Sequence, residues 1–174
     1  MSRKNQTRIF IVEDNEVFRL ALKGDIETAF PNKEIDIHSF ETGELCMLEF
    51  KKEKPQVVIL DYNLNSKHTD AANGINVLDW IKKEDKETNV IMLTSQDNIE
   101  IALKSFKHGA ADYVVKTETK FRKINNALFN LFKVMEAKKE AQMYKKFTVI
   151  LGMCIVFIVA SAIAIQIFEP SFFK

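Results

Sequence analysis

Several predicted strands end in side chains that could do chemistry. They are three carboxylates, two hydroxyls and an amine: Glu13, Asp14, Asp61, Thr94, Ser95 and Lys116. A single residue of this kind after a strand is commonly the N-cap of the next helix. Capping explains the whole set less well, because three carboxylates without a counter-charge would raise one another's pKa. A divalent cation, together with the lysine, would relieve that repulsion.

The available donor atoms indicate which cation such a site would take. Carboxylate and carbonyl oxygens suit Mg²⁺, whereas zinc is held mainly by Cys and His. The histidines, His38, His68 and His108, have no ligand spacing, and the cysteines, Cys46 and Cys154, lie far apart in different contexts. We therefore expect an Mg²⁺ site, and neither a zinc site nor a disulfide framework.

The elements that must position these groups alternate along the chain. Apolar runs rich in β-branched residues predict strands at residues 8–14, 35–40, 57–61, 90–95 and 112–116. Apolar residues at helical spacing predict helices at residues 16–30, 43–52, 74–83 and 99–108, and a fifth from near Thr119. This alternation predicts an α/β fold with a doubly wound parallel sheet. Such sheets bind ligands outside the carboxyl ends of their strands.

The charge balance excludes one class of partner. The chain has 25 Lys and Arg residues against 24 Asp and Glu residues, so it lacks the basic excess of a nucleic-acid-binding protein. Residues 117–146 are also too few to hold a DNA-binding domain between the last predicted strand and the apolar run that follows. We expect no nucleic-acid partner.

A long uncharged run, FTVILGMCIVFIVASAIAIQIF, occupies residues 147–168. As a helix it would be about 33 Å long, compared with roughly 30 Å for the hydrocarbon core of a bilayer. We expect a transmembrane helix here rather than a buried core helix. Four lysines precede the run and one follows it: Lys138, Lys139, Lys145, Lys146 and then Lys174. This bias places the N-terminal body in the cytoplasm, at the inner membrane, and residues 169–174 outside.

The segment in front of the apolar run, residues 133–146, has good helix formers and no breaker. We expect one helix to continue from the fifth predicted helix into the bilayer. Two interpretations of this juxtamembrane stalk stay open. It is either a solvated connector or a short pairing segment that makes a homodimer.

Four segments, in this order, resemble the signature segments of the receiver domain of bacterial two-component response regulators. They are VEDNEVFR at residues 12–19, VVILDYNL at 57–64, IMLTS at 91–95 and GAADYVVK at 109–116. The likeness covers residues 7–131, so we expect a receiver domain at 7–132 after a tail at 1–6. The resemblance implies a flavodoxin-like five-stranded sheet with the strand order 2-1-3-4-5.

The resemblance also implies a role for each candidate residue. Asp61 would be the phosphoacceptor, Glu13 and Asp14 the acidic pocket for Mg²⁺, and Asn63 a further metal ligand through its backbone carbonyl. Thr94 and Lys116 would assist phosphoryl transfer, and Thr94 and Tyr113 would form the switch. A histidine kinase or phosphotransfer protein would supply the phosphoryl group. Such a domain is not an enzyme, although it assists its own phosphorylation and dephosphorylation.

Two features depart from the family pattern. The family usually has a cis-proline after the lysine, whereas Thr117 follows Lys116 here, which leaves the aim of the lysine open. The segment between Asp61 and Gly74 is longer than is typical. It is either a plain surface insertion or a loop that controls access to the site.

Together these observations predict a membrane-anchored, single-domain response regulator that is phosphorylated on Asp61 and switches a protein-interaction face. Two alternatives remain. A receiver-like scaffold without phosphorylation is compatible with Thr117. An aspartate-dependent phosphohydrolase would use the same nucleophile and Mg²⁺, but it would normally have a second acid at the position of Asn63. The sequence does not identify the kinase, the signal or the downstream protein partner.

Overall fold

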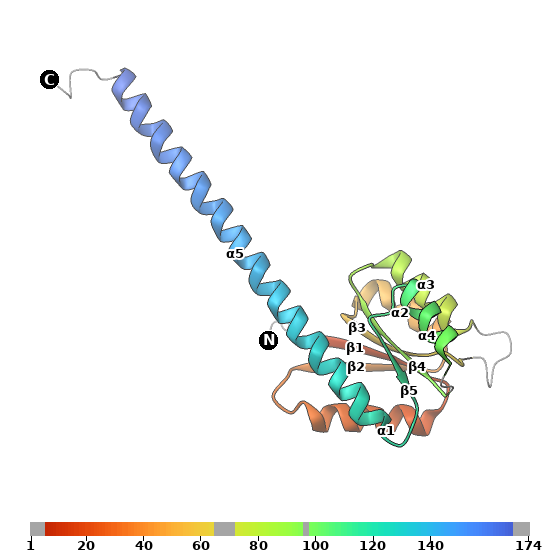
Figure 1. Cartoon of the computed structure of the whole chain (residues 1–174). Helices are drawn as coiled ribbons and strands as arrows, with labels where there is room; N and C mark the ends of the chain where they lie inside the picture. Colours follow the sequence, from red (N-terminus) through yellow and green to blue (C-terminus); the bar gives the residue numbers. More distant parts are fainter. Residues whose placement is uncertain (1–5, 65–71, 96–97, 169–174) are drawn as a thin grey trace. The chain divides into compact units, whose positions relative to one another are not determined.

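The computed structural model describes residues 6–64, 72–95 and 98–168 of the chain (Figure 1). The chain divides into two compact units, Met1–Phe129 and Asn130–Lys174. Most of the predicted N-terminal tail, all of the C-terminal tail and residues 65–71 of the predicted inserted loop lie outside the described residues.

The first unit is built on a five-stranded parallel sheet (Figure 1). Its strands are β1 (Thr7–Val12), β2 (Ile35–Phe40), β3 (Val57–Asp61), β4 (Asn89–Thr94) and β5 (Asp112–Val115). They lie in the order β2-β1-β3-β4-β5, as the sequence predicts. The connections leave β1 toward β2 on one side and cross to β3 on the other, so the strand order reverses at β1. The crevice for a ligand in such a sheet lies beside the carboxyl ends of β1 and β3.

The helices alternate with the strands: α1 (Glu16–Ala29), α2 (Gly43–Glu53), α3 (Gly74–Glu84), α4 (Ile99–Lys107) and α5 (Lys120–Phe168). In the first unit α1 and the start of α5 cover one face of the sheet, while α2, α3 and α4 cover the other (Figure 1). Each of the first four helices begins after a side chain that accepts a hydrogen bond from its first turn: Asn15, Thr42, Asn73 and Asn98. These caps satisfy N–H groups that otherwise lack partners within the helix.

Alternation along the strands divides the core between the two faces. Phe10 and Val12 of β1 pack in a buried cluster with Phe50 of α2 and Leu78 of α3. Since successive side chains of a strand point to opposite faces, Ile9 and Ile11 point to the face of α1 and α5. On that side Leu22, Ile26, Ile124 and Leu128 are fully buried. Apolar packing on both faces therefore stabilises the sheet and fixes the positions of its strand ends.

The second unit is formed by the later part of α5. Side chains of the described part of the uncharged run, residues 147–165, are exposed. Among the described residues, one helix is long and apolar enough to cross a membrane by length and composition, and it is α5. An exposed apolar surface of this size is typical of a segment that contacts a membrane or another protein.

Candidate functional site

The acidic residues of the candidate site follow two neighbouring strands. Asp61 is the last residue of β3, and Glu13 and Asp14 come directly after β1. β1 lies beside β3, with Val12 opposite Leu60, so the two strands end side by side. Asn15 then caps α1 by accepting a hydrogen bond from the backbone N–H of Phe18. The turn from β1 into α1 therefore holds the acidic pair at the carboxyl edge of the sheet.

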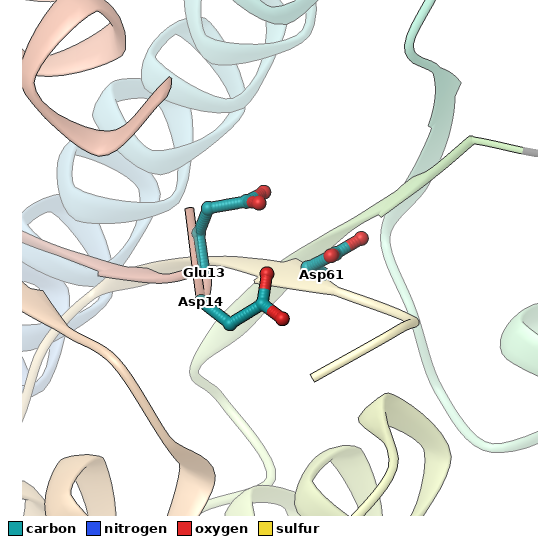
Figure 2. Close-up of side chains that lie close together, drawn as sticks. All are labelled: Glu13, Asp14 and Asp61. Atoms are coloured by element: carbon teal, nitrogen blue, oxygen red, sulfur yellow. The ribbon is translucent and has the colours of Figure 1, made fainter. Parts of the chain in front are cut away.

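The three carboxylates form one buried cluster (Figure 2). Glu13 and Asp61 are each 2% exposed and Asp14 is 5% exposed. One oxygen from each residue lies within 4.8 Å of an oxygen from each of the others. The structure therefore brings together the three carboxylates that the sequence places at strand ends, and the arrangement concentrates negative charge away from solvent.

Lys116 supplies the positive charge inside this cluster. Its Nζ lies 2.6 Å from Oε2 of Glu13 and 3.0 Å from Oδ2 of Asp61. The backbone N–H of Lys116 donates to the carbonyl of Thr94 at 2.7 Å, and that of Thr117 donates to the carbonyl of Val115 at 2.8 Å. No cis peptide bond occurs in the described part of the chain. The lysine therefore reaches the site with Thr117 at the position where the family usually has a cis-proline.

Burial governs the protonation of two of the carboxylates. It raises the pKa of Asp61, and Asp14 adds to that rise, while Lys116 and the backbone N–H of Asn63 oppose it. Burial also raises the pKa of Glu13, assisted by Asp61 and opposed by Lys116. One lysine is therefore not enough to offset the desolvation of this cluster.

The donor set fits a hard divalent cation. Oδ1 of Asp61 is buried and makes no hydrogen bond to any residue in the described ranges, whereas Oδ2 is held by Lys116. The cluster offers carboxylate oxygens and no Cys or His. Both properties are those of an Mg²⁺ site. The predicted contribution of Asn63 is through its backbone carbonyl. Its side-chain Nδ2 instead donates to Oγ of Ser95 at 3.1 Å, at the end of β4.

The predicted switch residues lie on the neighbouring strands. Thr94 ends β4 and is fully buried. Tyr113 in β5 is partly buried against the core cluster, and its Oη donates to the carbonyl of Asn98 at 3.4 Å. Asn98 is the N-cap of α4. Tyr113 therefore connects β5 to the start of α4 through a long, weak hydrogen bond.

The sequence reasoning missed Phe18, which contacts the lysine of the site. Nζ of Lys116 lies 4.9 Å from the centroid of the Phe18 ring, a cation–π distance. The same ring packs against Phe121 of α5, with centroids 5.6 Å apart. Phe18 comes four residues after Asp14, which places it in the first turn of α1. Its position in the turn that follows the acidic pair is the feature of the sequence from which the contact between Phe18 and Lys116 could have been predicted.

The base of the predicted inserted loop is described, although residues 65–71 are not. The backbone N–H of Gly74 donates to the carbonyl of Tyr62 at 2.9 Å, and that of Ala72 donates to Oε1 of Glu44 at 2.9 Å. Leu64 is fully buried in the core cluster. The two ends of the loop are therefore fixed close to the backbone of Asp61.

Comparison with known proteins identifies the class that this fold and site define. The family model of the response regulator receiver domain matches residues 9–129. The chain belongs to this family. Receiver domains are in general phosphoacceptor signalling domains, not enzymes, and they are phosphorylated by histidine kinases or phosphotransfer proteins. The predicted family and sheet topology are thereby confirmed.

Several individual proteins are similar to this chain. The regulatory protein AtoC of Escherichia coli (strain K12) is 29% identical over 109 residues, which are 63% of this chain and 22% of AtoC. A protein-glutamate methylesterase/protein-glutamine glutaminase of Rhodopseudomonas palustris is 31% identical over 114 residues, 64% of this chain and 27% of that protein. The crystal structure of the receiver domain of NtrX from Brucella abortus superposes with a TM-score of 0.60 at 25% identity, covering 71% of this chain and 97% of that domain. The chain thus spans about a quarter of the two curated relatives.

Proposed function

We propose that this chain is a membrane-anchored response regulator that accepts a phosphoryl group on Asp61 from a histidine kinase or phosphotransfer protein. One observation carries the proposal. The carboxylate of Asp61 is buried beside Glu13 and Asp14, one of its oxygens is bound by Lys116, and the other has no hydrogen bond within the described residues. A carboxylate of this kind is suited to act as a nucleophile that lysine and a cation assist.

In the proposed reaction an oxygen of Asp61 forms a bond to phosphorus while the bond from phosphorus to the donor's histidine nitrogen breaks. Lys116 holds the Asp61 carboxylate and is close enough to balance charge on the transferring oxygens. Glu13 binds the same ammonium group and orients it. Phosphoryl transfer depends mainly on such positioning and electrostatics.

Mg²⁺ is the cofactor that we propose for this step. Glu13, Asp14, Asp61 and the backbone carbonyl of Asn63 would hold it. When bound, the cation would reduce the repulsion between the carboxylate and the incoming phosphoryl group. Lys116 remains necessary in this scheme, because the cluster carries three carboxylates.

The proposed output is a change at the start of α4. Phosphorylation adds nearly two negative charges and three acceptor oxygens beside the end of β4. The hydroxyl of Thr94 would donate to them, and Tyr113 would exchange its 3.4 Å bond to Asn98 for a more buried position. A bond this long opposes the exchange weakly. The partner that reads the new surface would be another protein.

The proposed anchor is a transmembrane helix at residues 147–168. Its length, its lack of charge and the lysines before it support this location at the cytoplasmic membrane, with the receiver domain inside the cell. The proposed organisation is a tail at 1–6, a receiver domain at 7–132, a stalk at 133–146, the span, and an outer tail at 169–174.

Mass spectrometry of the full chain after incubation with acetyl phosphate and Mg²⁺ tests the phosphoacceptor. We expect one base-labile phosphoryl group, located on Asp61 by peptide mapping. Asp61→Asn should remain unmodified, and EDTA should greatly slow the modification of the natural chain. Modification of Asp61→Asn would contradict the assignment. A natural chain that stays unmodified would indicate a scaffold, and continuous release of phosphate from phosphate esters would indicate a phosphohydrolase.

A further inference from the structure

Four lysines of the second unit, next to the apolar run, lie on one side of the helix. At about 100° per residue, Lys138, Lys139, Lys145 and Lys146 fall within an arc of roughly 120° on the surface of α5. We call these four residues the lysine face. Lys133 and Glu140 lie on the opposite side of the helix, and Glu136 lies outside the arc. If these charged residues were spaced evenly around the helix, no side of it would be more positive than another.

The lysine face is exposed and continues directly into the apolar run. All four lysines are exposed, and Lys146 is followed at once by Phe147, the first residue of the uncharged segment. Met143 and Tyr144 beside them are also exposed. Aromatic and basic residues at such a boundary are typical of the interface between the hydrocarbon core and water.

The lysine face is longer along the helix axis than the headgroup region is deep, so all four lysines can meet the headgroups only if the helix leans. From Lys138 to Lys146 the helix rises about 12 Å. The headgroup region on one side of a bilayer is roughly 5–8 Å deep. An upright helix would hold Lys138 and Lys139 beyond that region. A lean of the ordinary size, about 20°, turns the lysine face toward the membrane but shortens the rise only to about 11 Å, so the long lysine stems must supply the rest of the reach to the headgroups.

We propose that the lysine face binds the anionic phospholipid headgroups of the cytoplasmic leaflet, with the helix leaning on the membrane on that side. The inference rests on the proposed membrane anchor. Two observations select lipid as the occupant: the face is contiguous with the span, and its charge is opposite to that of the leaflet. Glu140 is directed away from the surface that would repel it.

Lysine footprinting of the full chain tests this inference. The protein is reconstituted in vesicles of phosphatidylcholine, with or without one part in three of phosphatidylglycerol, and treated briefly with an amine-acetylating reagent. We expect each lysine of the face to react roughly fivefold more slowly in the anionic vesicles, which corresponds to about 1 kcal/mol per lysine. Lys133 is the internal control on the opposite side and should react equally in both. High salt should reduce the difference.

A matched pair of variants tests whether lipid binding depends on the lysine face or only on the net charge of the helix. Lys139→Gln and Lys133→Gln remove the same charge from opposite sides of the helix. Lys139→Gln should weaken the protection of the three remaining lysines of the face, whereas Lys133→Gln should leave it unchanged. Equal effects of the two variants, or equal protection of Lys133, would overturn the lysine face as a site.

Three further outcomes would also reject the inference, and they are distinguishable. If alkaline carbonate releases the protein from both kinds of vesicle, the span is absent and the anchor fails with it. If the protein is retained but its lysines react equally in both lipids, the anchor stands and the lipid site fails. Equal protection in both lipids that disappears when the protein is diluted in the bilayer would identify a second copy of the helix as the occupant.

Discussion

The carboxylate of Asp61 lies in surroundings that oppose its charge. Because burial raises its pKa in the folded protein, the folded state keeps this proton at pH values where the unfolded chain has lost it. The stability contributed by this group therefore falls as the pH rises from the ordinary carboxyl range, near 4, to the raised pKa. Above that range the charged and desolvated carboxylate is a cost to folding.

The neutral variant Asp61→Asn should remove this cost. In EDTA at pH 7 we expect Asp61→Asn to be more stable than the natural chain by on the order of 1 kcal/mol. The gain should shrink as the pH is lowered toward about 4, because the raised pKa favours the neutral carboxyl of Asp61 in the folded natural chain. Thermal unfolding followed by circular dichroism at both pH values measures it. A lower melting temperature for Asp61→Asn at pH 7 would show that the bond to Lys116 outweighs the desolvation.

Mg²⁺ should stabilise the natural protein through the same cluster. Ligand binding to the folded state alone adds RT ln(1+[L]/Kd), or about 1.4 kcal/mol at ten times Kd. Asp14→Ala removes one of the three carboxylates and should abolish the increase in melting temperature. Glu27→Ala, an exposed position on α1, should preserve it. A folded natural protein whose melting temperature ignores millimolar Mg²⁺ would contradict the metal site.

At the scale of the elements, the start of α3 is pressed against the backbone of the site. A Cβ at Gly74 would meet the carbonyl oxygen of Asp61 and lie 2.7 Å from Cα of Tyr62. Backbone cannot yield as a flexible side chain can, so Gly74→Ala must displace either α3 or the end of β3. We expect a destabilisation of about 1–3 kcal/mol, together with slower phosphorylation of Asp61.

Gly24→Ala is the matched control for that substitution. Gly24 lies in the middle of α1, and apart from the adjoining backbone of that helix a Cβ there would have no atom of the described residues within 4 Å. Alanine is the better helix former, so this variant should be more stable by up to about 1 kcal/mol. Urea unfolding of both variants measures the contrast. A Gly74→Ala variant as stable as the natural chain would mean that the helix can move without affecting the site.

The element pattern was predictable from the sequence to within one or two residues. The predicted strand 57–61 is β3, and the predicted helix 16–30 is α1 with one residue fewer at its end. β1 ends at Val12, two residues before the predicted end, because Asp14 turns toward the cap of α1 at Asn15. Apolar periodicity reports which face is buried and tolerates small errors at the ends of each element.

The contacts of Lys116 could not be predicted in the same way. The sequence placed it at a strand end, yet its partner Glu13 is 103 residues away along the chain, and Phe18 beneath it was missed altogether. Periodicity contains no information about which atoms meet across such a distance. Those contacts depend on the turn at Thr117, which the strand order alone does not define.

At the scale of the whole molecule, the chain combines a folded receiver domain with an exposed apolar helix. The division falls between Phe129 and Asn130, close to the end of the family match at residue 129. Among the residues whose burial is described, every buried apolar side chain precedes residue 147, so the described core takes nothing from the apolar run. Removal of the apolar helix should therefore leave the domain folded.

The full chain and a truncation ending at residue 146 should differ in location and not in chemistry. We expect the full chain to sediment with membranes and resist alkaline carbonate, and the truncation to be soluble and to accept phosphate from acetyl phosphate at an unchanged rate. Confinement to a membrane raises the effective concentration toward membrane-bound kinases. The truncation should therefore signal more weakly in cells although its isolated reaction is normal.

Three results would contradict this prediction for the whole molecule. The full chain could be recovered from the cytosol, an N-terminal tag could be accessible from outside intact cells, or the truncation could fail to fold. The last result would mean that residues 147–168 pack against protein, contrary to their exposure in the described part of the helix. If instead the truncation folds, is soluble and is phosphorylated normally, the apolar helix serves location alone, since the reacting groups all lie within the first unit.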